Sequence, residues 1–156
     1  MTLDSFITQC GKSKDTVLGW LNKNYVPGAY PIEGTDEWHI PDNARTPYTK
    51  RKPKNGGAKM YKSLANAVAG GYGICHELYN LPQQRFDIYV TQLIEAGIIT
   101  SYIVEDVIYY EPTLETLKFV KMSDKVALDV IAQLLEAGSK GTSQGVTEGL
   151  LSGVGA

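Results

Sequence analysis

The chain has 156 residues, of which 43% are hydrophobic and 21% are charged. Both fractions are close to the globular average, so they exclude a chain that is disordered throughout, and the length suits one domain or two small ones. No apolar run approaches the roughly 18 residues of a membrane span, and the cysteines Cys10 and Cys75 are too few for a disulfide framework. The first ten residues lack the basic-then-apolar pattern of a signal peptide. We therefore expect a soluble, cytoplasmic protein without a membrane partner.

Charge is divided unevenly along the chain, although the net charge of the whole is −2. Residues 1–59 hold nine Lys and Arg against six Asp and Glu, a balance of +3, whereas residues 60–156 hold six against eleven, a balance of −5. A polyanion would be attracted to the first part and repelled by the second. The two parts are therefore expected to meet different partners.

Two short helices are predicted at the start of the chain. The first spans about residues 2–10, because apolar residues recur there every three or four positions, and Gly11 ends it. The second begins at the N-cap Ser13 and runs to about Asn24. Its expected buried face consists of Val17, Trp20 and Leu21. Two helices joined by a short turn that contains glycine are typical of a helix-turn-helix.

A small hairpin, or wing, is predicted directly after the second helix. Pro27-Gly28 and residues 33–36 read as turns, and residues 38–41 alternate like a short strand. Residues 45–59 then contain six basic and no acidic residues, with two prolines and two glycines, which favours a linker. We accordingly expect a first domain at 1–48, a basic linker at 49–59, a second domain at 60–138 and a Gly/Ser-rich tail at 139–156.

The second domain is predicted to be α+β, so that the whole fold is mainly α with small β wings. Helices are expected at 59–69 and 82–96, a helical turn at 76–80, and one or two strands at 98–111 with a turn at Glu105-Asp106. Residues 114–122 fit either a helix or a strand. A last helix, capped by Ser123 and ended by Gly138, is expected to bury Val126, Val130, Ile131, Leu134 and Leu135. In the tail, glycine at every fourth position fits either a helix-packing face or a flexible segment, and we favour the flexible segment.

An ordered set of residues in the first domain carries a resemblance to a known family. The set runs from Gly-Lys-Ser-Lys-Asp-Thr-Val at 11–17, through Trp20 and the Val-Pro-Gly-Ala of 26–29, to Trp-His-Ile-Pro-Asp at 38–42. It resembles the N-terminal winged helix-turn-helix of the MerR-type and excisionase-like families over about a third of the chain. The resemblance implies DNA binding, with the second helix in the major groove and the wing against the minor groove or backbone. Relatives often carry arginines between the Thr-Val and the Trp, where this chain has Leu18-Gly19.

The residues expected to bind double-stranded DNA lie at the start of the second helix, along it and in the linker. Free N–H groups at a helix start suit a phosphate, lysines there can neutralise phosphates, and short polar side chains can reach base edges. The expected DNA-binding residues are Lys12, Ser13, Lys14, Asp15, Thr16, Asn22, Lys23, Lys50, Arg51 and Lys52. Alternatively, Leu18 touches a thymine methyl group, or the exposed surface of the helix meets a protein.

The second domain shows a weaker resemblance to a winged helix. Residues 93–99 and the Tyr/Ile-rich segment after them are similar to the end of the third helix and the wing strands of such domains. The acidic surroundings favour dimerisation or binding of a host or phage protein through residues 60–138 over a second DNA reader. Tyr102, Tyr109 and Tyr110 are expected to form a packed sheet face rather than a platform for nucleic-acid bases.

The sequence provides no convergent catalytic or metal-binding set. Cys75 and His76 are neighbours, and adjacent residues on a helix point roughly 100° apart, so they are poorly placed to share a proton. The cysteines and histidines also lack the paired spacing of zinc ligands. We expect neither an enzyme nor a cofactor. The leading hypothesis is a homodimeric transcriptional regulator or recombination accessory protein of a phage or mobile element; the alternative is a protein-binding inhibitor or adaptor of a host system with an autoregulatory helix-turn-helix.

Overall fold

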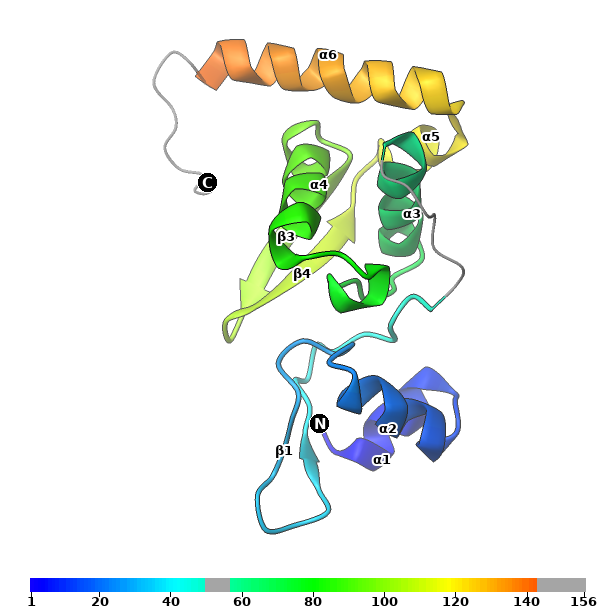
Figure 1. The fold of residues 1–156 in the computed structure, drawn as a ribbon, viewed down its shortest axis with the longest axis vertical. Coiled ribbons are helices and arrows are strands. Elements are labelled where there is room, and N and C mark those ends of the chain that lie inside the picture. Colours follow the sequence, from blue (N-terminus) through cyan, green and yellow to red (C-terminus); the bar gives the residue numbers. More distant parts are fainter. Residues whose placement is uncertain (50–56, 143–156) are drawn as a thin grey trace.

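The computed structural model describes residues 1–49 and 57–142, and from residue 135 onward it describes the backbone alone. About half of the protein is helical, and two small antiparallel hairpins complete it (Figure 1). The order of two α-helices followed by a hairpin occurs twice along the chain. The predicted class, mainly α with small β elements, is confirmed at this level. Among the described residues, no helix is both long enough and apolar enough to cross a membrane.

The first half of the chain folds as two helices and a short hairpin. Both helix starts are capped, the second at the predicted Ser13: the hydroxyl oxygen of Thr2 accepts from the N–H of Ser5 at 3.1 Å, and that of Ser13 accepts from the N–H of Thr16 at 3.2 Å. Gly11, with φ of 66°, ends the first helix in the left-handed conformation. The elements are α1 (Leu3–Cys10), α2 (Lys14–Asn22), β1 (Tyr30–Pro31) and β2 (Trp38–His39).

The second half adds the larger hairpin and four α-helices. Glu105 and Asp106, with φ of 51° and 65°, form the two-residue turn between its strands, at the predicted position. The ambiguous segment at 114–122 contains a helix. The elements are α3 (Ala58–Ala69), the 3₁₀ helix η1 (Glu77–Tyr79), α4 (Gln83–Glu95), β3 (Ile99–Val104), β4 (Val107–Pro112), α5 (Thr116–Lys121) and α6 (Asp124–Thr142).

Each half has its own hydrophobic cluster. The first cluster joins α1, α2 and the hairpin around the fully buried side chains of Phe6, Val17 and Ile40. The second joins α3 to α6 and the β3–β4 hairpin, and its fully buried side chains include Leu64, Leu93 and Phe119. Tyr25, just after α2, packs against both clusters. The halves therefore have separate cores that meet at one junction.

The segment 45–48 belongs to that junction. We expected it to close the first domain and begin the linker, but Tyr48 is buried in the second cluster, and its N–H donates to the carbonyl of Gly73 at 3.0 Å. Gly73 in turn donates to the carbonyl of Thr46 at 2.8 Å. Residues 45–48 were expected to end the first domain, whereas backbone pairing attaches two of them, Thr46 and Tyr48, to the second half. Residues 50–56 of the predicted linker lie outside the described residues.

The last helix differs from its prediction in length and in burial. Ser123 caps it as expected, but the helix continues through Gly138 to Thr142, because one glycine costs only about 1 kcal/mol in a helix that is already formed. The side chains of Val126 and Leu134 are 47% and 40% exposed, so their predicted core positions are wrong. α6 lies across α3 and α4 and buries a narrow stripe, Ala127 and Ile131 (Figure 1). The side chain of Leu135 and residues 143–156 of the predicted tail lie outside the described part.

Candidate nucleic-acid interface

The start of α2 is exposed and flanked by two cations. Lys12, Ser13, Lys14, Asp15 and Thr16 are all exposed. The Ser13 hydroxyl is hydrogen-bonded to the Thr16 hydroxyl at 2.9 Å and accepts from the Thr16 N–H, so it caps the helix. The N–H groups of Lys14 and Asp15 in the first turn have no acceptor within an α-helix. They and the positive end of the helix dipole can receive an anion that Lys12 and Lys14 attract.

The outward face of α2 follows from its buried face. Because Val17, Trp20 and Leu21 point into the first cluster, helical periodicity places Asp15, Gly19 and Asn22 on the opposite side.

Gly19 lies in open space, since a Cβ added there would meet no heavy atom within 4 Å. One alternative placed Leu18 against a thymine methyl group, but Leu18 is partly buried against the first cluster. Leu18 is therefore poorly placed to touch a thymine methyl group.

The far end of α2 carries a third cation. Lys23 is the C-cap residue, and its Nζ lies 5.8 Å from the centroid of the Tyr25 ring. Since each helical residue advances about 1.5 Å, this end lies roughly 13 Å from Lys14 along the helix. Exposed cations thus flank the outward face at both ends.

The wing carries acidic residues. Glu33, Asp36 and Glu37 are exposed in the loop between β1 and β2. Residues 1–49 hold four Lys and Arg (12, 14, 23, 45) against six Asp and Glu (4, 15, 33, 36, 37, 42), a balance of −2. The positive balance of residues 1–59 therefore comes from residues 50–59. Within residues 1–49, a phosphate is attracted to the ends of α2 and repelled by the tip of the wing.

One acidic residue near the wing, Asp42, is engaged in an ion pair. Asp42 pairs with the N-terminal amine at 2.8 Å, and this hydrogen bond and charge lower the pKa of its carboxyl. The pair fixes the chain start beside β2.

The predicted DNA-binding residues fall into two groups. Seven of them lie exposed on or beside α2: Lys12, Ser13, Lys14, Asp15, Thr16, Asn22 and Lys23. The linker residues Lys50, Arg51 and Lys52 lie outside the described residues.

Arg45 positions the first half against the second, and no local pattern in the sequence pointed to it. Its guanidinium donates to the carbonyl of Tyr110, to the hydroxyl of Tyr102 at 3.1 Å and to Glu111 at 2.8 Å. It also lies 6.0 and 5.7 Å from the ring centroids of Tyr102 and Tyr109. These partners are far from Arg45 in the sequence, so a reading of neighbouring residues does not find them.

The tyrosines of the β3–β4 hairpin lie on two faces rather than on the single packed face that the sequence predicted: Tyr110 points into the second cluster, and Tyr102 and Tyr109 share the opposite face beside Arg45. Tyr109 and Tyr110 are buried, and Tyr102 stacks on Tyr109 with 5.5 Å between ring centroids. Tyr102 is 36% exposed and lies at the edge of that face. This arrangement leaves the tyrosines in contact with Arg45 and the core rather than in a row open to bases.

Cys75 and His76 do not form a nucleophile–base pair. Cys75 is buried, and this burial raises the pKa of its thiol to about 12. The imidazole of His76 instead meets the carbonyl of Leu81 at 3.0 Å through Nδ1 and the carboxylate of Glu77 at 3.2 Å through Nε2. Over the described ranges, no group of three or more His, Cys, Asp and Glu side chains is arranged to hold a metal ion.

Comparisons of the chain with protein-family models, with curated proteins and with solved structures gave no match.

Proposed function

We propose that the chain is a DNA-binding regulator whose first domain is a winged helix-turn-helix. The observation that carries the proposal is the exposed, serine-capped start of α2 with Lys12 and Lys14 beside it, held from behind by the buried Trp20. In this proposal a phosphate meets the first turn of α2, and Asn22 and Asp15 face the base edges. The wing lies farther from the backbone, because its acidic tip would repel phosphates.

The second half is proposed to bring two copies together or to hold a protein partner. Its order of helix, helix and hairpin repeats that of the first half, as a degenerate winged helix would, but its charge opposes contact with DNA. In a homodimer, two α2 helices would occupy half-sites about one helical turn apart, so that two helices of low individual affinity bind one operator together. The resemblance to excisionase-like domains suggests either repression of a promoter or shaping of DNA for recombination.

The lysines at the start of α2 provide the direct test. We expect full-length protein to bind the DNA upstream of its own gene in a salt-sensitive manner, and Lys12→Ala with Lys14→Ala to weaken binding about tenfold at low salt. The double variant should also reduce the slope of log affinity against log salt by about 2, since two phosphate contacts are lost. Fluorescence anisotropy with labelled duplexes measures both quantities.

The matched control changes Lys121 and Lys125, two exposed lysines of α5 and α6, to Ala. The control alters the net charge equally and should leave the affinity within about twofold. The proposal is wrong if wild type gives no salt-sensitive binding, or if the two double variants weaken binding to the same extent.

A second candidate function is that of a protein-binding inhibitor or adaptor. It is favoured by exposed apolar side chains on the β3–β4 hairpin, where Ile103 is 66% and Ile108 is 50% exposed, within the acidic half of the chain. A partner identified by affinity capture should bind purified full-length protein and should lose that binding in Ile103→Asp with Ile108→Asp. Normal binding by this variant would exclude the hairpin as the contact.

A further inference from the structure

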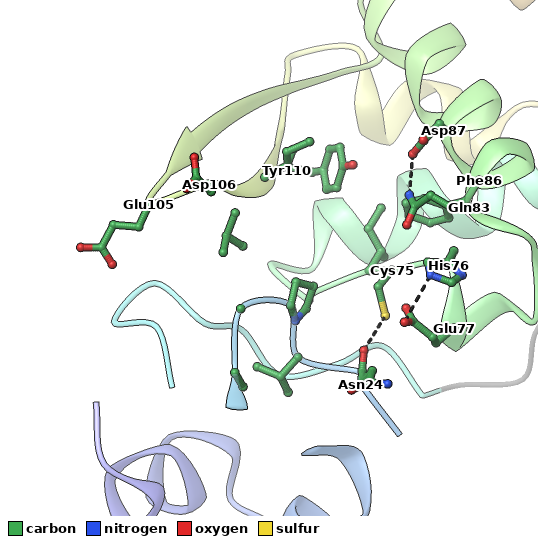
Figure 2. Close-up of a pocket in the computed structure, with 17 residues that line it drawn as sticks. Asn24, Cys75, His76, Glu77, Gln83, Phe86, Asp87, Glu105, Asp106 and Tyr110 are labelled. Atoms are coloured by element: carbon green, nitrogen blue, oxygen red, sulfur yellow. Dashed lines mark hydrogen bonds and ion pairs between the residues drawn. The ribbon is translucent and has the colours of Figure 1, made fainter. Parts of the chain in front are cut away.

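A cleft opens at the junction between the two halves (Figure 2). Its volume is about 530 Å³, within the usual range of roughly 300–1,000 Å³ for small-molecule sites, which are frequent at domain junctions. The first half contributes the segment 26–29 that follows α2, and the second half contributes η1, the start of α4 and the β3–β4 turn. Neither half encloses this space alone.

The cleft combines apolar and aromatic walls with four carboxylates. Val26 and Pro27 line it from the first half, and Phe86, Val107 and Tyr110 line it from the second. Such walls favour a ligand with an apolar or aromatic body, because each contact removes apolar surface from water.

The carboxylates stand on both sides of this apolar part. Glu105 and Asp106 occupy one side in Figure 2, with the Glu105 carboxylate directed away from the other residues, Glu77 and Asp87 occupy the other side, and Tyr110 lies between. Among the residues that line the cleft there is no lysine or arginine, and the imidazole of His76 is bound to Glu77 and Leu81. Asp87 accepts a hydrogen bond from Gln83 at 2.7 Å, which leaves its negative charge uncompensated. The carboxylates concentrate negative potential over an apolar wall.

We propose that this cleft binds a small organic cation with an apolar or aromatic body. The apolar walls receive the body, and the negative charges of Asp87 and Asp106 attract the ammonium group and select it over neutral or anionic molecules of the same shape. Because the ligand touches the segment after α2 and the β3–β4 turn together, its binding stabilises the observed arrangement of the two halves. The proposal does not depend on DNA binding.

The test compares three probes of similar shape against the full chain. 2-Phenylethylammonium, 2-phenylethanol and 3-phenylpropionate are titrated into isotopically labelled protein, and amide shifts are followed by NMR. We expect saturable shifts for the ammonium probe at residues 26–29, 74–77 and 105–108, and at least tenfold weaker binding of the alcohol and the carboxylate. Higher salt should weaken the ammonium probe alone.

Variants then locate the site. Asp87→Asn keeps an acceptor for Gln83, and Asp106→Asn suits a turn position with positive φ, so both variants preserve the local structure. Each should weaken the ammonium probe about threefold, and the double variant about tenfold. Asp129→Asn, on the exposed surface of α6, removes the same charge outside the cleft and should change nothing.

The proposal is overturned if the ammonium probe does not bind, if the alcohol binds equally well, or if the cleft variants behave like Asp129→Asn. Loss of DNA binding by Lys12→Ala with Lys14→Ala would leave these results unchanged, so the two proposals fail separately.

Discussion

At the scale of single residues, Thr116 stands out among the residues that the structure describes, because its side chain is polar and completely buried. Its hydroxyl donates to the carbonyl of Ile98 at 2.6 Å and accepts from the N–H of Thr113 at 2.7 Å. One hydroxyl thus satisfies two backbone groups that connect the start of β3 to the start of α5. Removing such a hydroxyl lowers the free energy of unfolding by more than the net contribution of its hydrogen bonds, because the partner groups stay buried and cannot bond to water instead.

Thr116→Val removes the hydroxyl and keeps the shape of the side chain. We expect the free energy of unfolding to fall by about 2 kcal/mol, because the Thr113 N–H loses its acceptor and the Ile98 carbonyl keeps only the longer hydrogen bond from the Thr113 hydroxyl at 3.1 Å. Urea denaturation measures the change. Thr100→Val, at an exposed position of β3, should stay within about 0.5 kcal/mol of wild type. Equal stability of the two variants would contradict the role given to Thr116.

Cys75 gives the stability of the protein a defined pH dependence. Burial raises the pKa of its thiol from 9.0 to about 12, so the folded state holds this proton more tightly than the unfolded state. The stabilisation is complete below pH 9 and is lost as pH rises from 9 toward 12.

Between pH 9 and 10, before most tyrosines ionise, we expect the free energy of unfolding of wild type to fall with pH. Cys75→Ala should flatten this part of the curve, as measured by urea denaturation at several pH values. Cys10, whose thiol is only partly buried, supplies the control: Cys10→Ala should retain most of the slope. A wild-type curve that is flat from pH 8 to 10 would refute the assignment.

At the scale of secondary-structure elements, α2 combines a firm start with a weak middle. The Ser13 cap stabilises its first turn, whereas Gly19 lowers helix propensity at a position where a side chain has free space. The helix is therefore less stable than it would be with a better helix-forming residue at position 19. Its outward face has room there for a side chain that would also face the proposed DNA.

Gly19→Ala should raise the free energy of unfolding by about 1 kcal/mol, because alanine fits without contact and favours the helix. Gly19→Arg should give a smaller gain in stability and tighten the proposed DNA complex, with a steeper salt dependence. Thermal denaturation and anisotropy measure the two effects. A Gly19→Arg protein that is stabilised but binds DNA no better would show that this face does not meet the duplex.

At the scale of the whole molecule, one arginine connects the two cores. The side chain of Arg45 is 17% exposed and bonds to the backbone and side chains of the β3–β4 hairpin. Tyr48 and Tyr25 complete the junction, since each packs against the second cluster. The orientation of α2 relative to the acidic half therefore depends on contacts that cross from one half to the other.

Arg45→Ala should lower the free energy of unfolding by about 2 kcal/mol, since it removes charged hydrogen bonds and leaves the Tyr110 carbonyl without this donor. Hydrogen exchange should increase first at residues 45–48 and 108–111. Lys118→Ala breaks an exposed pair with Glu115 at 3.7 Å and should change stability by less than 1 kcal/mol. Unchanged exchange at the junction would show that Arg45 does not hold the halves together.

The sequence by itself determined the local structure. The Ser13 cap, the Gly11 stop and the Glu105-Asp106 turn could be predicted because caps and turns depend on residues within a few positions of one another. The exposed site at the start of α2 was predictable for the same reason, since the buried Trp20 and its neighbours define the opposite face.

Tertiary structure alone decided how these pieces meet. Arg45 reaches partners 57 to 66 positions away, and the cleft exists only where two halves face each other. α6 buries Ala127 rather than Val126 because its neighbours cover a single stripe of its apolar surface. Such contacts follow from the shapes of packed elements, and a helical or strand period along one segment contains no information about the surface that it will meet.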